Sequence, residues 1–180
     1  MTSKEDTMDG SKPIALIGFM GVGKTSLGKK LAKQLGWIFI DTDKLIEQKQ
    51  GINIMQIFEK CGENHFRQLE HNLVLELKSV KNAVIATGGG LPCFHDNMIH
   101  LNSFAQTVYL KKEADQLTNH LKNKKSTRPL IAQLNEHQLH DYVEQKLKER
   151  TNFYELAQFC IDADRYALEK ITFLIQSKTL

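Results

Sequence analysis

Short apolar runs alternate with longer amphipathic segments over most of the chain, starting at Pro13. The runs expected to form strands are 14–17, 37–40, 83–86, 104–110 and 159–161. The segments expected to form helices are 24–34, 42–50, a short stretch ending near Gly62, 63–80, 96–101, 113–121, 136–155 and 166–176. Strands that alternate with helices in this way predict right-handed βαβ crossovers and a three-layer α/β sheet.

The ends of the first three expected strands carry unusual residues. The first strand runs into a glycine-rich loop, 18–25, the second ends at 41–43 (Asp-Thr-Asp), and the third ends at 88–90 (Gly-Gly-Gly). Ligands of open α/β sheets bind beyond the carboxyl ends of the strands. We therefore expect these three clusters to converge on one crevice.

The loop 18–25 reads GFMGVGKT and fits G-x-x-x-x-G-K-[ST], the phosphate-binding P-loop. Its glycines allow the backbone to turn its N–H groups inward, and the helix that follows adds a positive end. Lys24 can reach the β- and γ-phosphates, and the Thr25 hydroxyl can bind Mg²⁺. A glycine turn with a surface lysine is the alternative, but all specified positions and both flanks are present. The loop predicts binding of a nucleoside triphosphate.

Asp41 and Asp43 follow the second strand directly. Residues two apart in extended backbone point to the same side, so we expect both carboxylates to face the P-loop. One can hold Mg²⁺, and the other can accept a hydrogen bond and a proton from a substrate hydroxyl. The alternative is that Thr42 or Asp43 caps the helix 42–50.

The segment 88–90 consists of consecutive glycines, which cost conformational entropy. A flexible turn is one explanation. The other is that a ligand touches the backbone here or that φ is positive, and a floor of amides under a polar small molecule is the natural use.

Three arginines are candidates for binding a carboxylate. Arg67 has Glu63 and Glu70 one helical turn away on either side, Arg150 lies among helix charges, and Arg128 lies in a polar stretch. Arginine binds carboxylates bidentately. Spacing alone equally allows an exposed ion pair for Arg67, a solvated face for Arg150 and a loop cation for Arg128.

Composition describes an ordinary globular protein of 180 residues, with 41% hydrophobic and 25% charged residues and a net charge of +3. It offers no basic block for nucleic acid and no apolar run long enough for a membrane. The three cysteines are widely spaced, so we expect reduced thiols in a cytoplasmic protein. Residues 1–12 are expected to be a disordered leader, 13–180 a single domain, and the molecule a monomer, because no apolar stripe is left over.

In this order and combination, the motifs resemble those of the shikimate kinases. The resemblance covers the chain from about Pro13 to Leu174 and rests on segments 18–25, 41–47 (DTDKLIE), 62–70 (GENHFRQLE), 86–90 (ATGGG), 128–130 (RPL) and 150–154 (RTNFY). The P-loop alone would indicate only a nucleotide-binding protein. The resemblance implies the fold of the nucleoside monophosphate kinases, with a five-stranded parallel sheet and a mobile lid at about 122–136.

The resemblance also implies a role for each matching residue. ATP would be bound by Gly21, Val22, Gly23, Lys24, Thr25, Ser26, Arg128 and Arg165, and Mg²⁺ by Thr25 and Asp41. Shikimate would be bound by Asp43, Arg67, Gly89 and Arg150, with Lys24, Asp43 and Arg128 as the catalytic residues. Many relatives stack an arginine on adenine where this chain has 119–121 (Asn-His-Leu), and the loop 163–165 is expected to hold the base.

The reaction that the resemblance implies is transfer of the γ-phosphoryl group of ATP to the 3-hydroxyl of shikimate. A kinase for another polyol acid, such as gluconate, is the nearest alternative. A nucleoside monophosphate kinase is disfavoured because the chain has no arginine-rich stretch for a second nucleotide. A P-loop switch that binds a protein is disfavoured because the second set of polar clusters indicates a small-molecule acceptor.

Overall fold

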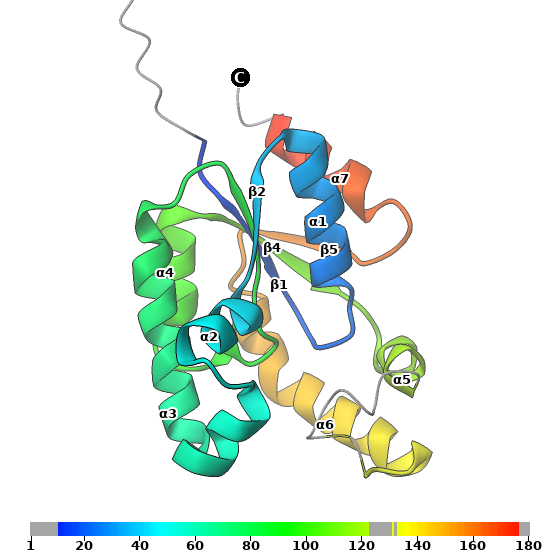
Figure 1. Ribbon diagram of the computed structural model, residues 1–180. Helices are drawn as coiled ribbons and strands as arrows, with labels where there is room; N and C mark the ends of the chain where they lie inside the picture. Colours follow the sequence, from blue (N-terminus) through cyan, green and yellow to red (C-terminus); the bar gives the residue numbers. More distant parts are fainter. Residues whose placement is uncertain (1–10, 123–130, 132, 177–180) are drawn as a thin grey trace, which may run out of the picture.

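A parallel β-sheet forms the centre of the molecule (Figure 1). The computed structural model describes residues 11–122, 131 and 133–176. In these residues the sheet has five strands in the order β2-β3-β1-β4-β5. The strands are β1 (Ile14–Ile17), β2 (Ile38–Asp41), β3 (Ala83–Ala86), β4 (Gln106–Lys111) and β5 (Phe159–Asp162). The strand β1 lies in the middle of the sheet. The P-loop that follows it therefore lies between the carboxyl ends of β2 and β3 on one side and those of β4 and β5 on the other.

Helices cover both faces of this sheet. Figure 1 shows α3 and α4 on one side and α1 and α7 on the other. The helices are α1 (Lys24–Leu35), α2 (Thr42–Gln50), α3 (Ile54–Glu76), α4 (Asn97–Phe104), α5 (Ala114–Lys122), α6 (Glu136–Tyr154) and α7 (Ala167–Gln176), with short 3₁₀ turns η1 (Leu77–Ser79) and η2 (Leu91–Cys93). The predicted three-layer fold with five parallel strands is confirmed.

The predicted boundaries hold to within a few residues. The two helices expected on either side of Gly62 are labelled together as α3, and Gly62 breaks the helix between them with φ 81°. A positive φ favours glycine, which explains the break that the sequence indicated. The strand expected to begin at 104 begins at Gln106, because α4 continues to Phe104.

The core lies around β1 and its neighbouring strands. Every residue of β1 and β3 is at most 2% exposed, as expected for parallel strands covered on both faces. The edge strand β2 leaves Ile38 57% exposed. At the start of the described chain, Ser11 is tied to the sheet by paired hydrogen bonds with Asn82.

Two predicted regions fall largely outside the described residues: most of the leader 1–12, and most of the lid 122–136, including Arg128. The single-domain boundary stays a prediction. Among the helices of the described residues, none combines the length and apolar character needed to cross a membrane.

Candidate active site

The P-loop adopts the backbone that its glycines predict. Gly18, Gly21 and Gly23 have φ of 138°, 83° and 109°. A Cβ on Gly18 would lie 2.8 Å from the carbonyl oxygen of Leu110, and one on Gly21 would lie 2.9 Å from the side chain of Leu121. Close approach and positive φ therefore both demand glycine here.

The loop opens onto the N-terminus of α1. The N-cap residue is Gly23, which has no side chain. The first backbone N–H groups of α1 therefore receive no hydrogen bond from a capping side chain. Lys24 is only 7% exposed, and its Nζ donates to the carbonyl oxygens of Gly18 at 2.5 Å and Phe19 at 2.8 Å. Thr25 and Ser26 are exposed at the same end. A helix N-terminus without a side-chain cap, next to a lysine, is suited to binding an anion.

Asp41 caps the helix α2 and also contacts the P-loop. Its Oδ2 accepts a hydrogen bond from Thr25 Oγ1 at 2.9 Å, and its Oδ1 accepts from the backbone N–H of Lys44 at 3.3 Å. The N-cap of α2 is thus Asp41, not Thr42 or Asp43. A hydroxyl and a carboxylate side by side at the P-loop are oxygen donors of the type Mg²⁺ prefers.

The expectation that Asp41 and Asp43 share an extended geometry is wrong. The helix α2 begins at Thr42, so Asp43 lies in its first turn. The Asp43 carboxylate instead lies against the glycine loop, since a Cβ on Gly88 would be 2.5 Å from Asp43 Oδ1. The buried Thr42 hydroxyl accepts the Gly88 N–H at 2.8 Å and fixes this contact.

Arg67 forms a buried ion-pair network, so the exposed-pair alternative is wrong. Its side chain is 8% exposed and that of Glu70 is 1% exposed. Arg67 Nη1 donates to Glu70 Oε2 at 2.7 Å, while Nη2 and Nε donate to Glu63 Oε1 at 2.7 and 3.1 Å. A guanidinium has five N–H groups, which leaves one on each Nη, and a carboxylate ligand needs these two.

Burial shifts the ionisation of this pair. Desolvation raises the pKa of Glu70 to about 7, and the charge of Arg67 opposes the shift while that of Asp43 adds to it. Desolvation lowers the pKa of Arg67, but Glu70 and Glu63 outweigh it and the net direction is upward. Arg67 therefore stays charged, whereas Glu70 titrates near neutral pH.

The glycines 88–90 are required for a reason that the sequence did not reveal. Positive φ is not the cause, because none of them has it. A Cβ on Gly90 would lie 2.7 Å from Arg67 Nη1, and one on Gly89 would lie 3.1 Å from the backbone nitrogen of Met20. Protein groups, namely a buried arginine and the P-loop, therefore occupy the space of the missing side chains.

Arg150 approaches the same region from α6, where it is half-buried instead of fully solvated. Its guanidinium lies 5.7 Å from the ring centroid of Phe19 in the P-loop. Arg67 is stacked similarly, 4.1 Å from the ring of Phe94. Guanidinium faces held on aromatic rings leave their edges for hydrogen bonds.

Sequence reasoning missed four side chains of this site. The spacing of Glu70 predicts only an ion pair with Arg67, and no pattern in the sequence assigns a site role to Cys93, Phe94 or Tyr154. Burial raises the pKa of the Cys93 thiol to about 11, while the charges of Arg150 and Arg67 act in the opposite direction. One signal was available for Glu70, because it shares a helix face with the apolar residues Phe66 and Leu73.

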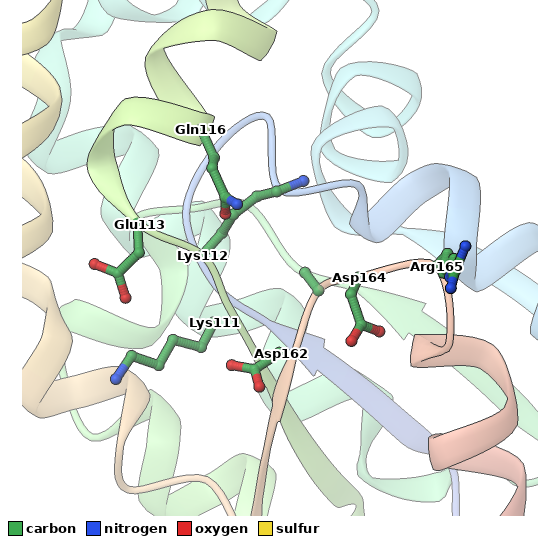
Figure 2. Close-up of a pocket in the computed structure, with 8 residues that line it drawn as sticks. Lys111, Lys112, Glu113, Gln116, Asp162, Asp164 and Arg165 are labelled. Carbon is green, nitrogen blue, oxygen red and sulfur yellow. The ribbon is translucent and has the colours of Figure 1, made fainter.

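A cavity of about 590 Å³ lies on the other flank of the P-loop, at the ends of β4 and β5 (Figure 2). Charged and amide side chains dominate its lining, which comprises Lys111, Lys112, Glu113, Gln116, Asp162, Ala163, Asp164 and Arg165. It includes the loop 163–165 that we expect to hold the base. The predicted nucleotide ligand Arg165 is exposed and lies 4.7 Å from the ring of Tyr166 at the edge of this cavity.

His120 connects this cavity with the P-loop. Its Nδ1 lies 3.3 Å from the carbonyl oxygen of Gly21 and 3.5 Å from Lys112 Nζ. The predicted site residues among those described therefore lie on both flanks of the P-loop, with Arg165 at the cavity. The residues after β2 and β3 lie on one flank of the P-loop, and the cavity lies on the other. Arg128 is outside the described residues.

The chain is similar to known proteins over most of its length. The family model described as shikimate kinase matches residues 20–178. A shikimate kinase of Parabacteroides distasonis is 39% identical over 158 residues, which cover 88% of this chain and 91% of that protein. The crystal structure of a shikimate kinase from Bacteroides thetaiotaomicron has a TM-score of 0.86 at 38% identity and covers 94% of this chain and 99% of its own. A shikimate kinase from Acinetobacter baumannii, solved in complex with shikimate, has a TM-score of 0.86 at 36% identity and covers 96% and 97%. The chain therefore belongs to the shikimate kinase family.

Proposed function

We propose that this protein transfers the γ-phosphoryl group of ATP to the 3-hydroxyl of shikimate, giving shikimate 3-phosphate and ADP. The observation that carries the proposal is the buried Arg67 network beside Asp43 and the glycine loop, next to a P-loop. An ATPase or a nucleotide-dependent switch protein would have no need for a buried carboxylate-binding group there. Family membership supports the same acceptor.

The P-loop residues would hold the triphosphate. Backbone N–H groups from Gly21 to Ser26 would bind phosphate oxygens, and Lys24 would leave the loop carbonyls for the β- and γ-phosphates. The cavity at the ends of β4 and β5 would receive the base, with Arg165 at its edge. The transition state of phosphoryl transfer is loose, so these residues act by positioning and charge compensation.

Thr25 and Asp41 fit a Mg²⁺ ion, because their oxygens lie 2.9 Å apart where the phosphates would enter. When bound, the ion supplies charge neutralisation at the β- and γ-phosphates. The protein contributes the two oxygen ligands and fixes them, one by the start of α1 and the other by the cap of α2.

The acceptor would lie between α3, α6 and the glycine loop. Arg67 and Arg150 would bind its carboxylate, and the backbone of Gly89 would line its ring. Asp43 would accept the hydrogen bond of the reacting hydroxyl and then its proton as the phosphoryl group arrives. Arg128, assigned from the sequence alone, would neutralise charge on the transferring group, and closure of the lid segment would exclude water.

The test is ADP release in a coupled assay with ATP and Mg²⁺, comparing shikimate, gluconate and a nucleoside monophosphate as acceptors. We expect turnover with shikimate that exceeds acceptor-free hydrolysis by several orders of magnitude. Equal or faster turnover with gluconate or a monophosphate would overturn the proposed substrate. ADP release that no acceptor stimulates would overturn the kinase assignment.

We also infer that the protein acts in the cytoplasm as a monomer with small-molecule partners. The exposed large apolar side chains are spread over β2, α3, α4, α6 and the region of α7, which supports a monomer. Cys61, Cys93 and Cys160 are free thiols, as suits a reducing compartment. Light scattering coupled to gel filtration tests the monomer, and a mass of two chains would contradict it.

A further inference from the structure

Tyr154, the last residue of α6, is fully buried at the back of the acceptor site. Its ring packs against that of Tyr109 on β4, with centroids 5.3 Å apart. Its hydroxyl donates a hydrogen bond to the carbonyl oxygen of Gly89 at 2.6 Å. A buried hydroxyl is retained at little cost only when it is hydrogen-bonded. The bond therefore ties the end of α6 to the loop that follows β3.

The glycine loop around Gly89 also packs against the P-loop and against Arg67. A Cβ on Gly89 would lie 3.1 Å from the backbone nitrogen of Met20, so the loop rests directly on the P-loop. The next residue, Gly90, rests on Arg67 Nη1 in the same way. Fixing the Gly89 carbonyl thus fixes the backbone segment that separates the P-loop from the carboxylate-binding arginine.

Arg150 lies one helical turn before Tyr154 on the same helix, and its guanidinium lies 5.7 Å from the ring centroid of Phe19. Burial raises the pKa of the Tyr154 phenol, the Cys93 thiol adds to this shift, and the Arg150 guanidinium opposes it. The phenol donates its one proton in the hydrogen bond to the Gly89 carbonyl oxygen.

We propose that Tyr154 is a positioning residue of the acceptor site, whose hydroxyl fixes the Gly89 carbonyl and, with it, the glycine loop that packs against Arg67. This inference rests on the proposed function. Tyr154 acts through Gly89, and its effect is on the acceptor and not on the nucleotide.

The test replaces Tyr154 by Phe, which removes the hydroxyl and keeps the ring. Tyr109→Phe is the matched control, because it removes a buried hydroxyl from the partner ring that faces Thr151 instead of Gly89. We expect Tyr154→Phe to raise the KM for shikimate roughly tenfold, as loss of one oriented hydrogen bond would, with the KM for ATP changed less than about twofold. Tyr109→Phe should leave both KM values near those of the wild type.

Two further readouts separate positioning from a merely structural role. Calorimetric binding of shikimate without ATP should weaken in Tyr154→Phe by the same factor, while the Tm values of the two Phe variants remain similar. A Tyr154→Phe variant with wild-type shikimate binding would overturn the inference.

Failure of the inference is distinguishable from failure of the proposed function. If the wild type does not phosphorylate shikimate, the proposed function fails and the variants are not needed to show it. If the wild type is active and Tyr154→Phe matches it in KM and calorimetric affinity, only the role of Tyr154 is overturned.

Discussion

Arg67 and Glu70 are buried one turn apart on α3, with Arg67 Nη1 donating to Glu70 Oε2 at 2.7 Å. The Coulomb attraction of such a pair is offset by the cost of desolvating both charges, so the pair is weak evidence for stability. Its printed hydrogen bonds leave one N–H group on each Nη of Arg67, a number that suits a carboxylate ligand. The pair is therefore consistent with the proposed binding of the acceptor carboxylate.

The first prediction concerns the pH dependence of stability. The pKa of Glu70 is about 7 in the folded protein and near 4.5 when the chain is unfolded. Between these values the native state holds more protons than the unfolded state, so stability falls as pH rises. The contribution of Glu70 should be complete below about pH 4.5 and should decrease by about 3 kcal/mol as pH passes through 7.

Urea unfolding of the wild type and of Glu70→Gln at several pH values between 5 and 8 checks this. The difference in unfolding free energy between them should shrink as pH rises. Glu63→Gln is the control, because Glu63 also binds Arg67 but its side chain is 54% exposed, and this variant should keep the wild-type slope. Parallel pH profiles for the wild type and Glu70→Gln would contradict the shifted pKa.

The second prediction is that Arg67→Lys raises the KM for shikimate at least roughly tenfold and leaves the KM for ATP unchanged. The ammonium keeps the charge, but one nitrogen cannot serve Glu63, Glu70 and a ligand carboxylate with the planar fork of arginine. Steady-state kinetics with each substrate varied measures the effect. Arg165→Lys, on the opposite flank, should not alter the KM for shikimate, and an equal rise there would contradict the assignment.

The P-loop could be predicted from the sequence because its signal is local. The glycines, Lys24 and Thr25 lie within one loop, and the same residues set its backbone. The helix α2 begins at Thr42 as predicted, and Asp41 caps it. The contact of Asp43 with Gly88 could not be predicted, because it joins segments that are far apart in the chain.

The burial of Arg67 was beyond sequence reasoning for a different reason. Its spacing to Glu63 and Glu70 is the same in an exposed ion pair. What buries it is the approach of Gly90 and the ring of Phe94, which lie in another part of the chain. Tyr154 is a similar case, because its partner Gly89 is distant in sequence. Contacts of this kind require the tertiary structure.

The third prediction uses two neighbouring glycines to separate catalysis from binding. In Gly88→Ala the new methyl would lie 2.5 Å from Asp43 Oδ1 and must displace it, so kcat should fall by roughly ten- to a hundredfold. In Gly90→Ala the methyl would lie 2.7 Å from Arg67 Nη1, so the KM for shikimate should rise instead. Steady-state kinetics on variants with checked Tm values measures both. If both variants change the same parameter, the roles of Asp43 and Arg67 are wrongly divided.

The fourth prediction distinguishes the two aspartates. Asp43→Asn should lower kcat by about a hundred- to ten-thousandfold, since the amide cannot accept the proton of the reacting hydroxyl. Asp41→Asn should instead raise the Mg²⁺ concentration that gives half-maximal rate, because Asp41 is the carboxylate at Thr25. Asn caps helices about as well as Asp, so Asp41→Asn should keep the cap of α2 and its stability. A Mg²⁺ titration of kcat for both variants is the measurement. A shift of the Mg²⁺ requirement in Asp43→Asn with normal kcat at saturation would exchange the two roles, because the carboxylate against Gly88 would then serve the metal.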